Sequence, residues 1–381
     1  MILYNAMKIA FDAKRLFNNN TGLGNYSRTI IDILAQYYPN NEYHLYTPII
    51  KEQQFANIYN NIPCCKTINK NSKLIGSLWR SSMQASQMKK NHINIYHGLS
   101  NEITSGLKKN NIASVVTIHD LAYITFPTMY KGIDRMIYNH KTKKACKDAD
   151  IIISISKSTE NDIIKYYGID AAKIKTVYQP VSPIYYQQLD KNTAATIVDK
   201  LDLPSEYMLY VGSINSRKNL LGIVEAINMM KQDNRIPLVV VGEGGEYKQK
   251  VLQYIAANNM QNQVIFLGRR NLTEIRALYT LARLFVYPSF YEGFGLPVVE
   301  AMLCGCPVVS SNTSSLPEAA GPNSLLADPY NTESIFHCIQ QALGNTSLRS
   351  EMIEKGFQYA IANFSPKSQA AKIMEIYQSL M

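Results

Sequence analysis

Short runs of β-branched and aromatic residues alternate along the whole chain with longer segments of helical periodicity. This alternation is typical of parallel α/β sheets, in which each strand is followed by a helix. The expected strands of the first half are 7–11, 43–47, 94–97, 114–118, 151–155 and 174–178. Those of the second half are 207–211, 238–241, 264–267, 284–287 and 307–310. The sequence therefore predicts two similar open sheets in tandem, with ligands beyond the carboxyl ends of the strands, in a cleft where two such domains face each other.

The length of 381 residues suits two domains of ordinary size. Several prolines and a polar stretch around Asp190–Thr193 make the region between the halves the best linker candidate. We expect a first Rossmann-like domain over 1–185, a linker over 186–205, a second Rossmann-like domain over 206–362 and a C-terminal segment over 363–381. Within that last segment, 366–380 is predicted to be an amphipathic helix whose apolar side covers a hydrophobic surface elsewhere.

Composition excludes several classes of protein. With 46% hydrophobic and 18% charged residues, the chain is not expected to be disordered. No stretch approaches the 18 to 20 apolar residues of a transmembrane helix, and the N-terminus does not resemble a signal peptide. The six cysteines lack zinc-site spacing, so we expect reduced thiols in a cytoplasmic protein and no bound metal.

The segment 288–309, PSFYEGFGLPVVEAMLCGCPVV, is the richest in residues suited to chemistry. A strand is expected to end at Tyr287, and a Gly-rich loop leads into a helix near Leu296 whose free backbone N–H groups could hold an anion. Glu292 precedes the loop and Glu300 follows within the helix, so both carboxylates could accept hydrogen bonds from ligand hydroxyls. Alternatively, Glu300 could merely complement the helix dipole.

A second candidate lies at 210–220, YVGSINSRKNL, where a strand ends in Gly212 and adjacent Arg217 and Lys218 precede a helix. Two cations at the carboxyl edge of a sheet could clamp a diphosphate. Taken alone, such a pair could equally be solvated surface charges.

In the first half, VVTIHD places His119 at the end of a strand, where it could line a cleft or serve a structural role. His97 ends another strand and is expected to face the same space. The segment NTGLGNYSR contains Gly22 and Gly24, but it lacks the third glycine and the strand context of a dinucleotide fingerprint. We therefore predict a mobile glycine loop there and reject NAD binding.

The segment EGFGLPVVE resembles the E-x7-E motif of the retaining glycosyltransferases of family 4, which have the GT-B fold. TGLGNYSR is similar to the N-terminal glycine loop of that family, VVTIHD to its His-bearing strand end, and YVGSINSRKNL to its phosphate-binding turn. SNTSSLPEAAG resembles the segment after E-x7-E, and the C-terminal helix resembles one that crosses back onto the first domain. Several of these segments are similar to bacterial mannosyltransferases that use GDP-mannose.

The resemblance implies that the second domain holds a sugar-nucleotide donor and the first domain an acceptor. Glu300 would then bind the ribose of the donor, and Glu292 a hydroxyl of the transferred sugar. Arg217 and Lys218 would neutralise the diphosphate without a divalent metal or other cofactor. The further donor contacts that it implies are backbone amides of Phe294, Gly295 and Leu296, the His119 side chain, Gly24 near the diphosphate, Gly212, and backbone groups around Gly268–Arg270 for the base, with Arg270 itself included.

The resulting hypothesis is a retaining hexosyltransferase that moves mannose from GDP-mannose to a glycan or lipid-linked glycan acceptor in cell-surface polysaccharide synthesis. A UDP-sugar such as UDP-glucose as donor, or a catalytically silent module that only binds a sugar nucleotide, remains an alternative. A nucleic-acid-binding protein is disfavoured because basic and aromatic residues form no RNA- or DNA-binding motif.

The formal charge of +10 lies wholly in the first half: residues 1–190 carry 23 basic and 13 acidic side chains, and residues 191–381 carry 16 of each. The two halves are therefore expected to meet different partners. We predict that part of the basic half faces an anionic membrane surface or a lipid-diphosphate-linked glycan, at the inner face of the membrane.

Overall fold

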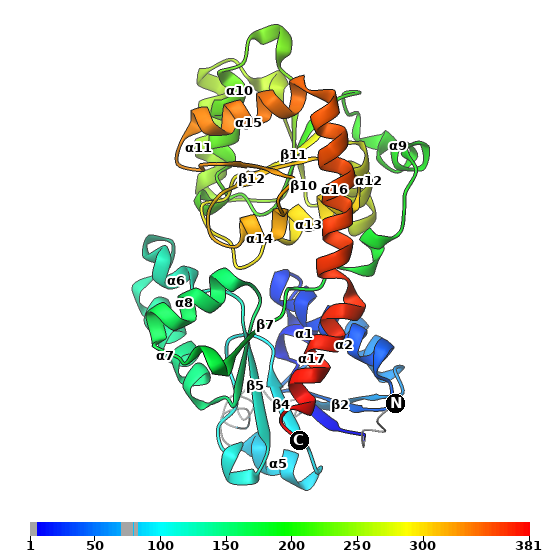
Figure 1. The fold of residues 1–381 in the computed structure, drawn as a ribbon, viewed down its shortest axis with the longest axis vertical. Helices are drawn as coiled ribbons and strands as arrows, with labels where there is room; N and C mark the ends of the chain where they lie inside the picture. The colour runs from blue at the N-terminus through cyan, green and yellow to red at the C-terminus, as the bar shows by residue number, and fades with distance from the viewer. Residues whose placement is uncertain (1–5, 70–78, 80–82) are drawn as a thin grey trace. The chain divides into compact units, whose positions relative to one another are not determined.

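The chain is described by a computed structural model, which covers residues 6–69, 79 and 83–381. Its elements divide into two compact units (Figure 1). The first unit consists of Met1–Pro180 together with Pro366–Met381, and the second is Val181–Ser365. Each unit is built around one sheet in which every strand pairing is parallel.

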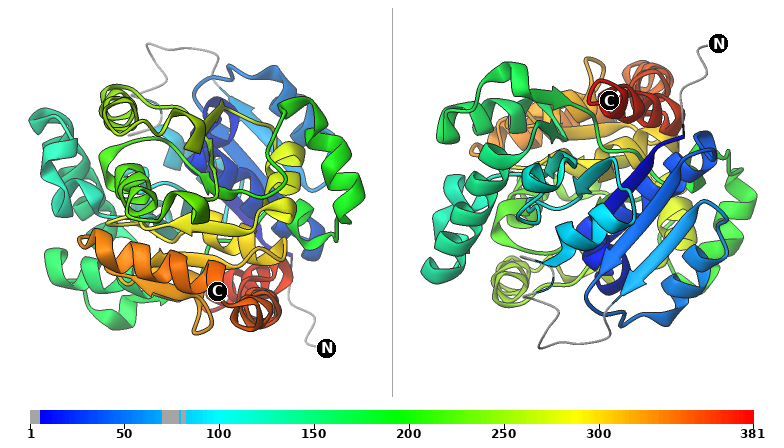
Figure 2. Two further views of the ribbon diagram at one scale, coloured as in Figure 1. Left: turned by 90° about the horizontal axis from the view of Figure 1, so that it is seen from above. Right: turned by 90° about the horizontal axis from the view of Figure 1, so that it is seen from below.

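The first sheet has seven strands in the order β3-β2-β1-β4-β5-β6-β7, seen from below in Figure 2. They are β1 (Lys8–Asp12), β2 (Glu42–Thr47), β3 (Cys65–Asn69), β4 (Ile95–Gly98), β5 (Ala113–Ile118), β6 (Ile151–Ser154) and β7 (Ile174–Thr176). All six predicted strands of this half are present. The additional strand, β3, lies at the sheet edge and is only partly buried, which is why its sequence lacks the apolar run of a central strand.

The helices of the first unit are α1 (Lys14–Asn18), α2 (Gly22–Tyr37), α3 (Gln53–Asn60), α5 (Gln84–Lys90), α6 (Ala122–Thr125), α7 (Gly132–Asp148) and α8 (Lys157–Tyr167). Of the two serines that could cap α8, Ser156 is the cap: its hydroxyl accepts the Thr159 N–H at 3.0 Å. The first unit also contains α17 (Pro366–Gln378), which packs against α2. Its buried residues include the predicted apolar side, namely Ala370, Ile373, Met374 and Tyr377.

The second sheet has six strands in the order β10-β9-β8-β11-β12-β13. They are β8 (Met208–Val211), β9 (Leu238–Val241), β10 (Val264–Gly268), β11 (Leu284–Tyr287), β12 (Val308–Ser311) and β13 (Leu325–Ala327). Its helices are α9 (Lys191–Val198), α10 (Leu220–Asn228), α11 (Glu246–Ala257), α12 (Leu272–Leu281), α13 (Leu296–Leu303), α14 (Leu316–Ala320), α15 (Thr332–Gly344) and α16 (Thr346–Phe364). The five predicted strands are present, and the unpredicted β13 is again an edge strand.

The segment predicted as a linker over 186–205 is structured and belongs to the second unit. It contains α9, which packs against α12. The polar stretch that suggested a linker is a helix start, since the Asp190 carboxylate accepts the N–H groups of Asn192 and Thr193, both at 3.0 Å. The chain leaves the first unit near Pro180, earlier than the predicted boundary at 185, and it returns at Pro366.

Within the part of the chain that the structure describes, no helix is both long enough and apolar enough to span a bilayer. All six cysteines carry free thiols.

Candidate active site

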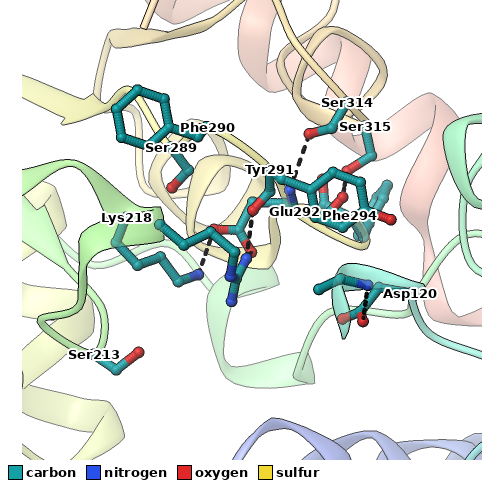
Figure 3. Close-up of polar contacts among 12 residues, drawn as sticks. Asp120, Ser213, Lys218, Ser289, Phe290, Tyr291, Glu292, Phe294, Ser314 and Ser315 are labelled. Atoms are coloured by element: carbon teal, nitrogen blue, oxygen red, sulfur yellow. Dashed lines mark hydrogen bonds and ion pairs between the residues drawn. The ribbon is translucent and has the colours of Figure 1, made fainter. Parts of the chain in front are cut away.

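Two neighbouring strand ends of the second sheet carry the charged residues that the sequence singled out. β8 and β11 lie side by side, and the strand order changes direction between them, because β9 and β10 lie on one side and β12 and β13 on the other. Such a switch point is where open α/β sheets bind ligands. A turn with Arg217 and Lys218 follows β8, and the loop with Glu292 follows β11. Figure 3 shows Lys218 and Glu292 next to each other.

The structure brings Arg217, Lys218 and Glu292 into one cluster. Lys218 Nζ lies 2.5 Å from Glu292 Oε1, and an Arg217 guanidinium nitrogen lies 3.1 Å from Glu292 Oε2. Lys218 also donates to the hydroxyl of Tyr287, and Arg217 to the carbonyl of Tyr291. The three charged side chains are only 9–17% exposed. Two cations thus share one carboxylate, which leaves the cluster with a net positive charge.

Glu292 is ionised despite its burial. Burial alone would raise the pKa of this carboxyl, but the charges of Lys218 and Arg217, with the hydrogen bond from Lys218, outweigh it and lower the pKa to about 2. The carboxylate therefore stays available as an acceptor for hydroxyl groups at neutral pH.

Two serines hold the backbone of the Glu292 loop, and the sequence did not single them out individually. The Glu292 N–H donates to Ser314 Oγ at 2.9 Å, and Ser315 Oγ donates to the carbonyls of Glu292 and Phe294, each at 2.8 Å (Figure 3). Ser314 has a φ of 53°, which non-glycine residues adopt only where their surroundings impose it. Both serines lie in SNTSSLPEAAG, the segment after β12, so their place beyond a strand end was the available signal.

The start of α13 contains Phe294, Gly295 and Leu296, whose backbone amides were predicted to contact the donor. Gly295 caps the helix with a φ of 113°, and a Cβ at this position would lie 2.7 Å from Leu316 Cδ2, so only glycine fits. The ring of Phe294 is buried against Phe364, with centroids 5.3 Å apart. Leu296 is the first residue of the helix, followed by Pro297, as predicted. The first N–H groups of such a helix lack intrahelical acceptors and favour an anion.

Glu300 contrasts with Glu292. It lies one turn into α13 and accepts a hydrogen bond from the hydroxyl of Tyr279 at 3.3 Å. Burial raises its pKa to about 7, although hydrogen bonds from Tyr279 and Tyr185 oppose the shift. A ligand that offers hydroxyl donors would stabilise the charged form, so this carboxyl is poised to ionise on binding.

Gly212 and Arg270 occupy different places in the second sheet. Gly212 directly follows β8, where a Cβ would contact the hydroxyl of Tyr210 at 3.5 Å and the ring of Tyr287 at 3.5 Å. Arg270 follows β10, the edge strand, and β9 separates it from β8. Arg270 is therefore not part of the Arg217–Lys218–Glu292 cluster, and a role in donor binding stays a prediction.

His119 lies directly after β5 in the first unit and is 6% exposed. Its Nε2 lies 2.8 Å from the carbonyl oxygen of Leu99, which requires the proton on Nε2 and leaves Nδ1 as an acceptor. Burial lowers its pKa, so the ring is neutral at physiological pH. The ring also packs edge-on against Tyr26, with centroids 4.6 Å apart. His119 thus makes well-defined structural contacts, and a role at the donor sugar stays a prediction.

Gly24 lies in the first turn of α2, so the predicted loop over 20–28 ends at Thr21. A Cβ at Gly24 would lie 1.7 Å from the carbonyl oxygen of Asn19, which excludes every side chain at this position. The Asn19 side chain accepts the N–H groups of Thr21 at 2.8 Å and Gly24 at 3.2 Å. The prediction of a glycine loop was therefore wrong, because the two glycines start a helix.

His97, which was expected to face the same space as His119, is fully buried instead. Its Nδ1 lies 2.6 Å from the hydroxyl of Tyr377 on α17, and its Nε2 lies 2.8 Å from Thr117 Oγ1. Thr117 Oγ1 lies 3.1 Å from the hydroxyl of Tyr26. His97 thus links the C-terminal helix to the inside of the first unit.

Comparisons with known proteins agree across both units. The sequence profile of Glycosyltransferase Family 4 matches residues 22–183, and that of Glycosyl transferases group 1 matches 196–359. O-antigen chain mannosyltransferase B of Escherichia coli is 29% identical, over 98% of this chain and 100% of that protein.

Solved structures show the same fold. The structure of HepE from Anabaena in complex with UDP-glucose matches with a TM-score of 0.76 at 18% identity, covering 98% of this chain and 100% of that one. WaaG, a glycosyltransferase involved in lipopolysaccharide biosynthesis, matches with a TM-score of 0.72 at 20% identity, over 97% and 99% of the two chains. The chain therefore belongs to the glycosyltransferases of the GT-B fold, with a family 4 domain followed by a group 1 domain.

Proposed function

We propose that this glycosyltransferase moves mannose from GDP-mannose to a glycan or lipid-linked glycan in the synthesis of a cell-surface polysaccharide, with retention of the anomeric configuration. The observation that carries the proposal is the buried cluster of Lys218, Arg217 and Glu292 at the switch point of the second sheet. The full-length similarity to an O-antigen mannosyltransferase supports mannose as the sugar.

In this reaction the two cations bind the diphosphate of the donor. Arg217 and Lys218 are fixed by Glu292, by Tyr287 and by the Tyr291 carbonyl, so their charges are already oriented before the donor arrives. They stabilise the negative charge that grows on the departing nucleoside diphosphate. The N–H groups at the start of α13 add to the same effect.

Glu292 accepts a hydroxyl of the transferred mannose, and Glu300 accepts hydroxyls of the donor ribose. The acceptor hydroxyl attacks the sugar on the face from which the diphosphate leaves, and the departing phosphate oxygen takes up its proton. His119 and Gly24 are proposed to contact the donor, and Gly212 and Arg270 its nucleotide. The cytoplasm, at the inner face of the membrane, is the proposed place of the reaction.

Because two side-chain cations and a helix start serve the diphosphate, we propose that no divalent metal or other cofactor is required. The test is turnover in excess chelator, which should equal turnover without it. A strict requirement for a divalent ion would contradict this part of the proposal.

The donor is tested by a thermal-shift and turnover screen of GDP-mannose, UDP-glucose and ADP-glucose, with release of each nucleoside diphosphate as the readout. GDP-mannose should give the largest stabilisation and the fastest release. Faster turnover of UDP-glucose would replace the donor assignment, and binding without turnover of any donor would indicate a silent binding module. Proton NMR of the product anomer tests retention.

A further inference from the structure

A row of buried polar side chains runs through the first unit from α17 toward His119. The hydroxyl of Tyr377 lies 2.6 Å from His97 Nδ1, and His97 Nε2 lies 2.8 Å from Thr117 Oγ1. Thr117 Oγ1 in turn lies 3.1 Å from the hydroxyl of Tyr26, whose ring packs against that of His119. All of these residues are at most 6% exposed. We call Tyr377, His97, Thr117 and Tyr26 the Tyr377–Tyr26 relay.

Elements that are far apart in the sequence contribute to the Tyr377–Tyr26 relay. Tyr26 lies on α2, and Tyr377 lies on α17, which packs against α2 (Figure 1). His97 and Thr117 lie on the neighbouring strands β4 and β5. The helix α17 follows α16 after a single residue, Ser365, so the relay begins where the chain returns from the second unit to the first.

The chemistry of the Tyr377–Tyr26 relay gives it one defined arrangement. Buried polar groups cost free energy unless each of them is paired, whereas apolar side chains of the same shape would fill this space without that cost. A neutral imidazole has one N–H and one acceptor nitrogen, so His97 bridges two hydroxyl groups. Removing any member leaves its neighbours unpaired in the interior. The relay therefore fixes the position of the Tyr26 ring more strictly than apolar packing would.

The remaining contacts of His119 hold its backbone and one ring nitrogen. Its N–H donates to Asn101 Oδ1 at 2.9 Å, and its carbonyl accepts the Thr159 hydroxyl at 3.3 Å. Its ring donates from Nε2 to the Leu99 carbonyl at 2.8 Å. A rotation of the imidazole would break this last bond and drive the ring against Tyr26, whose plane lies at 86° to it with centroids 4.6 Å apart. The Tyr26 ring is thus the side-chain support of the His119 ring.

We propose that the Tyr377–Tyr26 relay positions the imidazole of His119 so that Nδ1 accepts a hydroxyl of the donor sugar. This role rests on the proposed contact of His119 with the donor, and it makes α17 necessary for turnover as well as for the fold. The relay residues are positioning residues, which act through His119 and touch no substrate. Their effect on rate is large enough to measure, because a displacement of about 1 Å in a catalytic contact costs on the order of 100-fold.

The test is a double-mutant cycle in kcat, measured as release of the nucleoside diphosphate from the fastest donor of the screen above. Thr117→Val keeps the shape of the side chain and removes the oxygen that joins His97 to Tyr26. It should lower kcat by about 10-fold, and His119→Ala should lower it by about 100-fold. Added to His119→Ala, Thr117→Val should cause no further loss, because it acts only through that ring. The affinity for the nucleoside diphosphate alone, which lacks the sugar, should not change.

Thermal unfolding checks that each variant is folded at the assay temperature. Tyr26→Phe is a second variant of the relay, which keeps the ring, removes the hydroxyl and should lower kcat about threefold. The matched control is Thr47→Val, at the end of β2, with β1 and β4 between it and β5. It removes a buried hydroxyl that donates to the Ile49 carbonyl at 2.8 Å, and it should keep the wild-type kcat.

Two kinds of result would contradict the role of the relay. Wild-type kcat in both Thr117→Val and Tyr26→Phe, an equal loss when Thr117→Val is added to His119→Ala, or a weaker affinity for the nucleoside diphosphate would overturn this inference and leave the proposed function standing. Wild-type kcat in His119→Ala would instead refute the proposed contact of His119 with the donor, and the inference with it.

Discussion

The two units share a strand order, apart from the additional edge strand β7 of the first, but they differ in net charge. The first unit has 25 Lys and Arg against 13 Asp and Glu, a formal +12, while the second has 14 against 16, a formal −2. Yet the second unit contains the buried ionic cluster of Arg217, Lys218 and Glu292. Net charge therefore indicates which partners a unit attracts in solution, whereas the chemistry of a site depends on the positions of a few charged side chains.

The first unit buries two neutral histidines, His97 and His119. His97 is fully buried between Tyr377 and Thr117, and its pKa is lowered to about 3 by burial and by the neighbouring His119. His119 is neutral for the same main reason. The first unit thus holds these two histidines in hydrogen bonds between uncharged groups, whereas the second unit holds Arg217, Lys218 and Glu292 as ions beyond its strand ends.

The largest expected effect comes from removing a cation of the cluster. Lys218→Ala should lower kcat by about 10²–10³-fold, because the charge that develops on the leaving diphosphate loses one oriented partner. Steady-state release of GDP from GDP-mannose measures the loss, and circular dichroism checks that the variant is folded. The matched control, Lys250→Ala, removes an exposed lysine of the same unit and should retain full activity. Wild-type turnover in Lys218→Ala would refute the site.

The next prediction concerns stability at acid pH. Glu292 has a pKa lowered from 4.5 to about 2, so its charged form stabilises the fold above pH 4.5, and this contribution is lost as the pH falls toward 2. Between pH 5 and pH 2 the free energy of unfolding of the wild type should fall by about 3 kcal/mol more than that of Glu292→Gln. Urea unfolding across this range measures both. Parallel pH profiles would show that the cluster is not ionic.

For the first unit, the prediction that corresponds to the Glu292 test concerns a hydrogen bond between uncharged groups. Tyr377→Phe removes the hydroxyl that lies 2.6 Å from His97 Nδ1 and leaves a buried ring nitrogen without that partner, at a cost of about 2 kcal/mol. The matched variant in the second unit is Tyr207→Phe, whose buried hydroxyl donates to the Leu278 carbonyl at 2.9 Å. That carbonyl also accepts the Ala282 N–H, so the cost should be about 1 kcal/mol or less. Calorimetric unfolding compares the two, and equal losses would argue against a special role for the His97 network.

These residues also show how far a sequence can predict a fold and a site. The central strands and the start of α13 at Leu296 were predictable because buried strands and glycine-rich turns leave local patterns. The edge strands β3 and β13 were not, because β3 is partly exposed and lacks an apolar run, and β13 has only three residues. The helix α9 was taken for a linker, because a polar N-cap and a polar loop have the same composition.

Long-range contacts of the site were the least predictable. Lys218 and Glu292 are 74 positions apart, and their pairing depends on β8 and β11 being neighbours in the sheet. Gly24 was recognised as a constrained position, but the reason for the constraint was wrong. A glycine is required there because the Asn19 carbonyl approaches closely at a helix start, not because the segment is a loop. A residue type indicates a constraint, but the neighbour that imposes it comes from the tertiary structure.

The smallest expected effect distinguishes Glu300 from Glu292, the two glutamates of the candidate site. The pKa of Glu300 is raised to about 7, so its ionised form grows from a minor to the major species between pH 6 and pH 8. If ionised Glu300 binds the ribose, the affinity for GDP-mannose should rise about 10-fold over this range, in proportion to the binding-competent fraction. GDP-mannose is the suitable probe, because its diphosphate is fully esterified and does not titrate near pH 7.

Isothermal titration of wild type, Glu300→Gln and Glu292→Gln at pH 6, 7 and 8 completes the comparison. Glu300→Gln should show a flat profile, whereas Glu292→Gln should bind more weakly but keep the slope, because the pKa of Glu292 lies near 2. Stability should move the other way: a raised pKa means that the contribution of Glu300 is present at pH 4.5 and lost as the pH passes 7, so wild type should weaken relative to Glu300→Gln. An unchanged slope in Glu300→Gln would assign the pH dependence to another group and leave Glu300 only its hydrogen bonds to Tyr279 and Tyr185.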